Sequence, residues 1–335
     1  MLINRVALLY NTTHAPIPVT HRCRWYTTAV DGQTTKKNKP LSKNKEKALA
    51  KERLQLEKAT NAFNTLYTDM YGAERYSNEE QMNTTVKRLQ KLEKVEHINT
   101  LAYTSSERFP QPPKDHRGLS IYYPLDAASL LVVDALRLEP DHQVLDMCAA
   151  PGGKTVGIMQ HLSNPSASLT SNEISPDRLR RLKQVLRDYL GDEYRQRVTV
   201  TRRDAMHWRE EEKYHRVLLD APCSAERHLL RDADELSKWT PKRTSTLYKE
   251  QVVMLKSALR AVRVGGLVVY STCSISNKEN DAVIERVLDK SKVIKKEWKV
   301  GEQTTHGWAV LPDRSDGWGP MYFSVLERLP DDPSQ

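Results

Sequence analysis

Short apolar runs alternate with segments of helical patterning from about Leu125 to the end of the chain. The short runs predict buried strands, and the longer segments between them predict helices. The predicted strands are 143–147, 168–172, 198–201, 216–220, 267–270 and 321–329. The predicted helices are 126–136, 154–161, 176–189, 247–262 and 280–288. This alternation predicts an α/β fold with a doubly wound, Rossmann-like parallel sheet and helices on both faces.

Proline and glycine support two of these boundaries. Pro176 stands at the first turn of its helix, where a missing N–H costs nothing. Gly265 and Gly266 follow the helix 247–262, and we expect them to be its C-terminal stop.

The part before Leu125 has a different pattern. Residues 31–47 are polar and Lys-rich and predict disorder, whereas 46–71 and 78–92 predict helices. Pro110, Pro112 and Pro113 predict a linker. The expected organisation is a leader over 1–30, a basic, partly disordered and helical extension over 31–115, and an α/β domain over 116–332.

The first 30 residues have the composition of an organellar leader. They contain Arg5, Arg22 and Arg24 but no acidic residue, because the first acid is Asp31. Acid-poor, Arg-containing and hydroxyl-rich composition is typical of a mitochondrial transit peptide. We therefore expect import into the mitochondrial matrix; the alternative is a disordered basic tail.

Composition narrows the class of protein. With 335 residues and 39% hydrophobic content, the chain can bury a sizeable core, and no apolar stretch is long enough to predict a membrane span. Of the net charge of +9, residues 1–60 carry +8, with 12 Lys or Arg against 4 Asp or Glu. The excess basicity thus belongs to the extension. Lysines between 36 and 58 would attract RNA phosphates, or form only a solvated helix face.

A glycine-containing loop, 148–154, follows a predicted strand and opens a predicted helix. Such loops bind anions or cofactors, although an ordinary turn is the alternative. The Walker pattern is incomplete because position 148 is Cys, and no GxGxxG is present. A cofactor without a pyrophosphate therefore fits this loop better than a nucleoside triphosphate does. The sequence thus disfavours an ATPase.

Acidic residues recur at the predicted strand ends. Asp146, Glu173, Asp204 and Asp220 each close a strand, and carboxyl ends of parallel strands face one crevice. Glu173 lies about 20 residues beyond the glycines, where α/β nucleotide sites place the acid that binds ribose. For any one of these acids, a helix N-cap is the alternative role.

Two of the four cysteines follow strands in similar contexts. Cys223 lies in Asp-Ala-Pro-Cys-Ser after one strand, and Cys273 lies in Ser-Thr-Cys-Ser after another. A thiolate is a soft nucleophile that attacks an electron-poor ring carbon, although a lone cysteine is more often a small buried residue. The four cysteines, at positions 23, 148, 223 and 273, have neither zinc-site spacing nor a disulfide framework, so we predict no metal site.

Residues from about 118 to 329 resemble the Sun-type RNA cytosine-5 methyltransferases, which use S-adenosylmethionine. The segments that carry the resemblance are 126–129, 146–154, 172–175, 203–205, 220–224 and 271–274. The continuation 223–229, with Arg227-His228 where many relatives are Gly-rich, and the ending 317–323 look most like the mitochondrial members. Residues 1–115 show no such resemblance.

The resemblance implies a mechanism. Cys273 would attack C6 of cytosine, and Cys223 would assist release of the product. Asp220 would hold the cytosine ring, and Lys154 would help to position it. Because a Pro-Cys cysteine is the nucleophile in DNA cytosine-5 methyltransferases, Pro222-Cys223 leaves the opposite assignment open. The residues expected to contact S-adenosylmethionine are Cys148, Ala149, Ala150, Pro151, Gly152, Gly153, Lys154, Glu173, Arg178, Asp204 and Asp220.

The resemblance also sets expectations for partners. The expected substrate is mitochondrial ribosomal RNA of the small subunit, with transfer RNA as the nearest alternative. No separate RNA-binding domain is recognisable, and mitochondrial relatives without one can rely on a helical-repeat, mTERF-like partner protein. A non-catalytic ribosome-assembly factor on the same fold is the alternative from another class.

Overall fold

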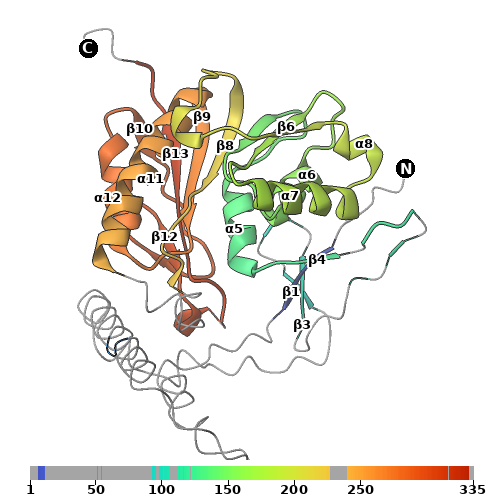
Figure 1. Cartoon of the computed structure of the whole chain (residues 1–335), viewed down its shortest axis with the longest axis horizontal. Helices are drawn as coiled ribbons and strands as arrows, with labels where there is room; N and C mark the ends of the chain where they lie inside the picture. The colour runs from blue at the N-terminus through green and yellow to red at the C-terminus, as the bar shows by residue number, and fades with distance from the viewer. Residues whose placement is uncertain are drawn as a thin grey trace, which may run out of the picture.

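A mixed nine-stranded sheet dominates the computed structural model (Figure 1). The structure describes residues 7–11, 51, 54, 93–95, 98–100, 102–105, 112, 114–115, 117–120, 122–226, 240–315 and 317–331. The strand order is β11-β12-β13-β9-β8-β5-β6-β7, and β10 also pairs with β13. The strands are β5 Gln143–Asp146, β6 Ser168–Asn172, β7 Val198–Thr201, β8 Tyr214–Asp220, β9 Val262–Thr272, β10 Ser291–Val293, β11 Glu302–Gln303, β12 Trp308–Val310 and β13 Met321–Arg328.

Five adjacent strands, β5 to β9, run parallel, and β13 runs antiparallel to β9. From β5 the chain proceeds outward through β6 and β7 on one side and through β8 and β9 on the other. This reversal creates a topological switch point at the carboxyl end of β5. The predicted doubly wound, Rossmann-like fold is therefore confirmed, with an antiparallel strand beside its parallel part.

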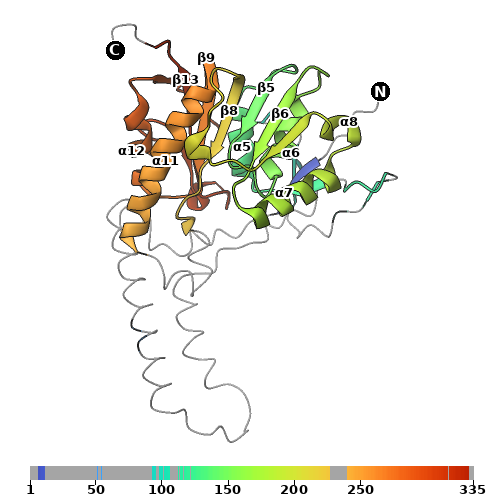
Figure 2. The same ribbon diagram turned by 45° about the horizontal axis from the view of Figure 1, so that its top comes forward.

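Helices cover both faces of the sheet, as Figure 2 shows. The α-helices are α5 Ala127–Ala135, α6 Gly153–His161, α7 Pro176–Tyr189, α8 Asp192–Arg195, α11 Pro241–Ala261 and α12 Asp281–Ile284. Neighbouring strand residues point to opposite faces. Thus Val144 packs in the core shared with α5, α6 and α7, whereas Leu145 packs in the core shared with α11 and α12.

α5 is buried along its whole length, since every residue from Ala127 to Ala135 is shielded from solvent. Its amino end is fixed by Asp126, whose Oδ1 accepts hydrogen bonds from Ala128 N at 2.9 Å and from Gly319 N at 3.1 Å. α7, in contrast, buries only Leu182 and Leu186 and presents its remaining face to solvent. The apolar run predicted one helix and the 3.6-residue period predicted the other.

A smaller sheet adjoins the main one, with strand order β2-β3-β1-β4. Its strands are β1 Ala7–Asn11, β2 Glu93–Lys94, β3 Ala102–Ser105 and β4 Tyr122–Pro124. The sequence did not predict these strands. β1 pairs in parallel with both β3 and β4, although it lies within the segment predicted to be a transit peptide.

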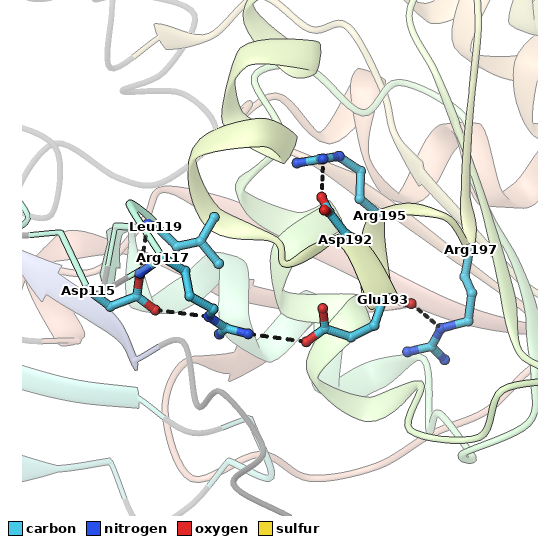
Figure 3. A network of polar contacts seen from close by, with 7 residues as sticks. All are labelled: Asp115, Arg117, Leu119, Asp192, Glu193, Arg195 and Arg197. Carbon is cyan, nitrogen blue, oxygen red and sulfur yellow. Dashed lines mark hydrogen bonds and ion pairs between the residues drawn. The ribbon is translucent and has the colours of Figure 1, made fainter.

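A polar network joins the segment before β4 to α8 (Figure 3). The carboxylate of Asp115 accepts hydrogen bonds from the backbone N of Arg117 at 2.8 Å and of Leu119 at 2.9 Å. The Arg117 guanidinium then reaches Glu193 on α8 at 3.5 Å. Backbone hydrogen bonds to Asp115 lower its pKa, since they favour the ionised carboxylate.

The prediction that Gly265 and Gly266 stop a helix is wrong. α11 ends at Ala261, and β9 begins at the next residue, so both glycines lie inside a strand. The pairing of β9 with β8 shifts register at this point. Gly265 has φ +74°, and a Cβ on Gly266 would stand 2.9 Å from the carbonyl oxygen of His215. The glycines therefore permit a bulge and a close approach between strands.

Other predictions differ only at the ends or lie outside the described residues. α11 begins at Pro241, six residues earlier than predicted, and the predicted helix 280–288 is α12 flanked by the 3₁₀ turns η2 Asn277–Glu279 and η3 Glu285–Val287. The predicted helices 46–71 and 78–92 lie outside the described residues, except for Lys51 and Leu54. Within the described part of the chain, no helix is both long and apolar enough to cross a bilayer.

Candidate active site

The parallel strands deliver their carboxyl ends to one edge of the sheet, at the switch point beside β5. Strands β5, β6, β7, β8 and β9 end at Asp146, Asn172, Thr201, Asp220 and Thr272. The loops that follow these strands carry most of the predicted site residues. The exceptions are Asp220, which ends β8 itself, Gly153 and Lys154, which begin α6, and Arg178, which lies on α7. The fold thus gathers residues that are up to 125 positions apart in the sequence, from Cys148 to Cys273.

Two free thiols, Cys223 and Cys273, meet at this edge, and we call them the thiol pair. Their sulfur atoms are 3.0 Å apart, although 50 residues separate them. They meet because β8 and β9 are adjacent and parallel, with Asp220 in register with Ser271. The hydrogen bond with Cys273 raises the pKa of Cys223, and burial adds to the shift. Cys223 therefore retains its proton at neutral pH.

An ion pair lies beside the thiol pair. Lys154 Nζ, in the first turn of α6, is 2.7 Å from Asp220 Oδ2, and the Ser271 hydroxyl donates to Asp220 Oδ1 at 2.9 Å. The Lys154 side chain is only 12% exposed. Burial acts to lower the pKa of Lys154, but the negative charge of Asp220 outweighs it and the pKa is raised overall. The site thus holds a charged ammonium against a carboxylate.

Asp146, at the end of β5, is fully buried below this ion pair. Its Oδ2 accepts the hydroxyl of Thr155 at 2.7 Å, whereas its Oδ1 has no hydrogen-bond partner among the described residues. Burial is the largest cause that raises its pKa, to about 7. This carboxyl group therefore braces β5 against α6 and leaves one acceptor available to a ligand.

Asp146→Asn is expected to remove a pH dependence of stability. An unfolded aspartate loses its proton near pH 3.8, whereas the folded one keeps it to about 7, so the unfolded state binds fewer protons between these values. The contribution of Asp146 to the free energy of unfolding should therefore fall by about 3 to 4 kcal/mol as the pH rises from 4 to 7, and the wild type should lose that much more stability than Asp146→Asn. Urea titrations at both pH values test this. A fall of equal size in Asp146→Asn would contradict the assignment, and exposed Asp177→Asn is the control.

The glycine loop is shaped by the protein's own side chains. A Cβ on Gly152, where φ is +118°, would stand 2.9 Å from Val185 Cγ1 of α7. A Cβ on Gly153 would stand 2.7 Å from Tyr123 Cε1 of β4. The sequence suggested that these glycines allow close approach of a ligand; in the structure, they first allow close packing of the loop against α7 and β4.

Glu173 lies beside that loop and is 3% exposed. Its Oε1 accepts the backbone N of Ser175 at 2.9 Å, and its Oε2 is buried without a hydrogen-bond donor among the described residues, with Arg178 Nε at 3.5 Å. Arg178 also donates to the carbonyl oxygen of Ala150 at 2.7 Å. Glu173, Arg178 and the loop 148–153 are therefore connected by direct contacts at this edge of the sheet.

Two further residues predicted to contact the cofactor, Asp204 and Cys148, also lie on loops at this edge of the sheet. Asp204 caps η1 Ala205–His207, because its Oδ1 accepts Met206 N at 2.9 Å, and its Oδ2 is 2.9 Å from His207 Nδ1. This is the N-cap role that the sequence left open. Burial raises the pKa of Cys148 well above its usual range, so this thiol stays neutral and contributes an apolar surface.

Asn172 is a site residue that the sequence did not predict. Its Nδ2 donates to the carbonyl oxygens of Met147 at 3.0 Å and Arg203 at 2.9 Å, and its Oδ1 accepts from the hydroxyl of Thr201 and from the backbone N of Arg203. One amide thereby joins the loops after β5, β6 and β7. An asparagine at a strand end ordinarily indicates a turn, so its spacing gave no signal of this role.

Comparison with known proteins establishes the family of the chain. The family model described as 16S rRNA methyltransferase RsmB/F matches residues 133–326, more than half of the chain. The chain belongs to this family. The resemblance to that family is thus confirmed over the matched range. Strands β5 to β9 with α6 and α7, which form the carboxyl edge of the sheet, lie wholly within it.

Curated relatives of the RsmB/F domain include two kinds of cytosine-5 methyltransferase. "5-cytosine rRNA methyltransferase NSUN4" of Xenopus tropicalis is 38% identical over 245 residues, covering 66% of this chain and 60% of that protein. "tRNA (cytosine(34)-C(5))-methyltransferase, mitochondrial" of Danio rerio is 37% identical over 235 residues, covering 64% of this chain and 63% of that protein. The alignments therefore span less than two thirds of either relative.

Solved structures share the RsmB/F fold. A methyltransferase homolog protein from Pyrococcus horikoshii has a TM-score of 0.63 and 21% identity, covering 82% of this chain and 99% of that one. NSun6 from Pyrococcus horikoshii, crystallised with SFG, has a TM-score of 0.55 and 23% identity, covering 68% and 58%. These similarities confirm the expected Rossmann-like methyltransferase fold.

Proposed function

We propose that this RsmB/F protein is an RNA cytosine-C5 methyltransferase that uses S-adenosylmethionine and acts on mitochondrial RNA. The observation that carries the proposal is the thiol pair, with sulfur atoms 3.0 Å apart, next to the Lys154–Asp220 ion pair on the carboxyl edge. A site that only binds nucleotides has no use for two thiols and a buried ion pair. A covalent methyl transfer to a pyrimidine uses all four groups.

The Cys273 thiolate forms a bond to C6 of cytosine, and the electron pair of the C5–C6 double bond moves so that C5 becomes nucleophilic. The cofactor supplies an electrophilic methyl group, which C5 accepts. A base then removes the C5 proton, the double bond re-forms, and the Cys273 thiolate leaves. Cys223 keeps its proton because of its raised pKa, so it can act as an acid beside the nucleophile and give a proton to the Cys273 thiolate as it leaves.

The Lys154 ammonium stabilises the cytosine ring during attack, and the Asp220 carboxylate holds the ring through its amino group or a protonated ring nitrogen. Attack at C6 places negative charge on the ring, and charged groups held in a half-buried site act more strongly on it than in water. Ser271 fixes one oxygen of Asp220, and Lys154 fixes the other. A target base in a duplex must be extruded to reach these groups.

The residues of the carboxyl edge fit S-adenosylmethionine. Two buried carboxylate oxygens, Glu173 Oε2 and Asp146 Oδ1, lack hydrogen-bond donors among the described residues, and ribose hydroxyls or an ammonium group would supply them. Glu173 follows the second strand of the fold, where ribose-binding acids lie. The loop 148–153 and Arg178 would hold the remainder of the cofactor, with Asp204 near the base.

Glu173→Gln is expected to weaken binding of S-adenosylmethionine by about tenfold, because the amide replaces the charged acceptor and loses its ion pair with Arg178. Isothermal titration of the purified protein measures the change. Glu193→Gln on the exposed side of α8 is the matched control. Equal affinity of both variants and the wild type would exclude Glu173 from the ribose site.

We infer ribosomal RNA of the mitochondrial small subunit as the substrate, a matrix location, and a helical-repeat, mTERF-like partner that helps RNA binding. The names of the relatives support RNA cytosines in both ribosomal and transfer RNA. The composition of 1–30 supports import. The resemblance to mitochondrial relatives that rely on a helical-repeat partner supports the partner, and mixing the purified protein with the RNA alone tests whether one is needed.

Bisulfite sequencing of mitochondrial ribosomal and transfer RNAs, from cells with and without the gene, tests the function. We expect loss of methylation at a ribosomal cytosine, restored by the wild type but not by Cys273→Ala. Loss at a transfer RNA cytosine instead would favour the second substrate class. Restoration by Cys273→Ala, or no change at any cytosine, would contradict catalysis and favour an assembly role.

A further inference from the structure

Two glutamates lie fully buried on the loops that carry the thiol pair. Glu226 is three residues after Cys223, and Glu279 is six residues after Cys273; they are 1% and 0% exposed. Both reach the same hydroxyl group, since Ser224 Oγ is 2.5 Å from Glu226 Oε1 and 2.5 Å from Glu279 Oε1. Two buried carboxylates in contact with one hydroxyl need a further hydrogen atom.

A count of hydrogen atoms makes this requirement explicit. The Ser224 hydroxyl has one hydrogen and can donate it to only one of the two carboxyl groups. The other oxygen contact at 2.5 Å would then bring an anionic oxygen against a lone pair, which is repulsive. A second proton, carried by one of the carboxyl groups, removes the conflict. That group then donates to the Ser224 oxygen, and the Ser224 hydroxyl donates to the other group in a charge-assisted O–H···O⁻ hydrogen bond.

The surrounding donors identify the protonated group. In its contacts with described residues Glu226 accepts, because Oε1 also receives the Ser274 hydroxyl at 2.9 Å and Oε2 receives the backbone N of Ile275 at 3.3 Å. Glu279 Oε2 accepts from Ser224 N at 3.0 Å and from Gln251 Nε2 at 2.9 Å. Among the described residues, Glu279 Oε1 contacts only the Ser224 hydroxyl.

The orientation of Gln251 supports this assignment. Its Nε2 lies 2.9 Å from the carbonyl oxygen of Pro222, which can only accept, so the amide nitrogen must point toward Pro222 and Glu279 Oε2. Glu279 Oε2 is therefore an acceptor, and the proton resides on Oε1. Burial, followed by the negative charge of Glu226, raises the pKa of Glu279, in agreement with this count.

We propose that Glu279 is protonated, that Glu226 is ionised, and that hydrogen bonds from Glu279 to the Ser224 hydroxyl and from this hydroxyl to Glu226 position the two cysteine loops. The four residues Ser224, Glu226, Ser274 and Glu279 form what we call the carboxyl clasp. It connects the loop after β8 with the loop after β9 by side chains, and so fixes the separation of the two sulfur atoms. Glu226 and Glu279 are positioning residues, and their effect on catalysis rests on the proposed function.

An asymmetry between two conservative variants tests the clasp. In Glu279→Gln, the amide NH₂ donates to Ser224 Oγ and the amide oxygen accepts from Ser224 N and Gln251, so the variant reproduces the protonated acid. In Glu226→Gln, an NH₂ group replaces one of the two accepting oxygens. It then faces the Ser224 and Ser274 hydroxyls or the backbone N–H of Ile275, which donate to the carboxylate in the wild type. We expect methylation within about threefold of wild type in Glu279→Gln, and a loss of about tenfold or more in Glu226→Gln and Glu279→Ala.

Two readouts do not depend on methylation. The infrared difference spectrum between wild type and Glu279→Gln should contain the carbonyl stretch of one protonated carboxylic acid. Oxidation by diamide, whose azo group takes up the two hydrogens lost by the thiols, should form the Cys223–Cys273 disulfide at a similar rate in wild type and Glu279→Gln, and about tenfold more slowly in Glu226→Gln. Mass spectrometry detects the disulfide.

The outcomes separate the clasp from the proposed function. The carboxylic acid band together with the disulfide asymmetry supports the clasp, even if no RNA is methylated. Absence of the band, or tolerance of Glu226→Gln with failure of Glu279→Gln, overturns it. If Glu226→Gln does not fold, the band decides alone, because Glu279→Gln is isosteric with the protonated acid. Glu285→Gln, on the exposed side of η3, is the control.

Discussion

Cys273→Ala is expected to lower methylation by at least about a thousandfold and to form no covalent complex with RNA, because it removes the nucleophile of the proposed mechanism. Cys223→Ala is expected to methylate the cytosine once and then remain attached to it. The reason is that bond formation at C6 needs only Cys273, whereas release needs the second thiol. The two sulfur atoms are close enough, at 3.0 Å, for both to act on one base.

The measurement is a denaturing gel of enzyme incubated with RNA and S-adenosylmethionine, combined with bisulfite sequencing of the RNA. A slowly migrating adduct should accumulate in Cys223→Ala and be absent from Cys273→Ala and from the double variant. Cys23→Ala is the control, since this thiol lies in the predicted leader. An adduct in Cys273→Ala but not in Cys223→Ala would assign the attack to Cys223 and reverse the roles.

Asp220→Asn is expected to lower kcat by about a hundredfold or more, with a smaller effect on the affinity for S-adenosylmethionine. The amide can keep the hydrogen bond from Ser271, but it removes the negative charge that faces Lys154 at 2.7 Å. The ammonium group then remains partly buried without its counter-charge, and the base loses a group that holds it.

A double-mutant cycle separates these two causes. Lys154→Met removes the ammonium alone, and the double variant Lys154→Met, Asp220→Asn removes both charges. If the ion pair acts as a unit, kcat of the double variant should be at most about threefold lower than kcat of either single variant. Fully additive losses in kcat would show that each residue acts independently on the base, and an unchanged kcat in Asp220→Asn would exclude it from the chemistry.

The sequence predicted the elements that form the carboxyl edge because their signals are local. β6, β7 and α7 begin and end at the predicted residues, and Pro176 marks the amino end of α7. The strand-end acids and cysteines were predicted as a group because parallel strands deliver their carboxyl ends to one edge. The roles assigned to individual residues stay predictions.

Features that depend on contacts between distant segments were not predicted. The burial of Glu279 was not visible in Ser-Asn-Lys-Glu-Asn, a polar sequence that is typical of an exposed turn. The glycine pair 265–266 has the composition of a helix stop, but strand pairing with β8 converts it into a bulge. The strands β10, β11 and β12 have two or three residues each, too few for a periodic signal.

The meeting of Cys223 and Cys273 at one point has a consequence for how such enzymes diverge. Each sulfur atom is supplied by its own loop, and the two loops follow neighbouring strands of the same direction. Under the proposed function, the attacking role could therefore pass from one loop to the other without any change of topology. Sequence comparison alone would not reveal such an exchange, because the two loops follow the same pair of strands in either case.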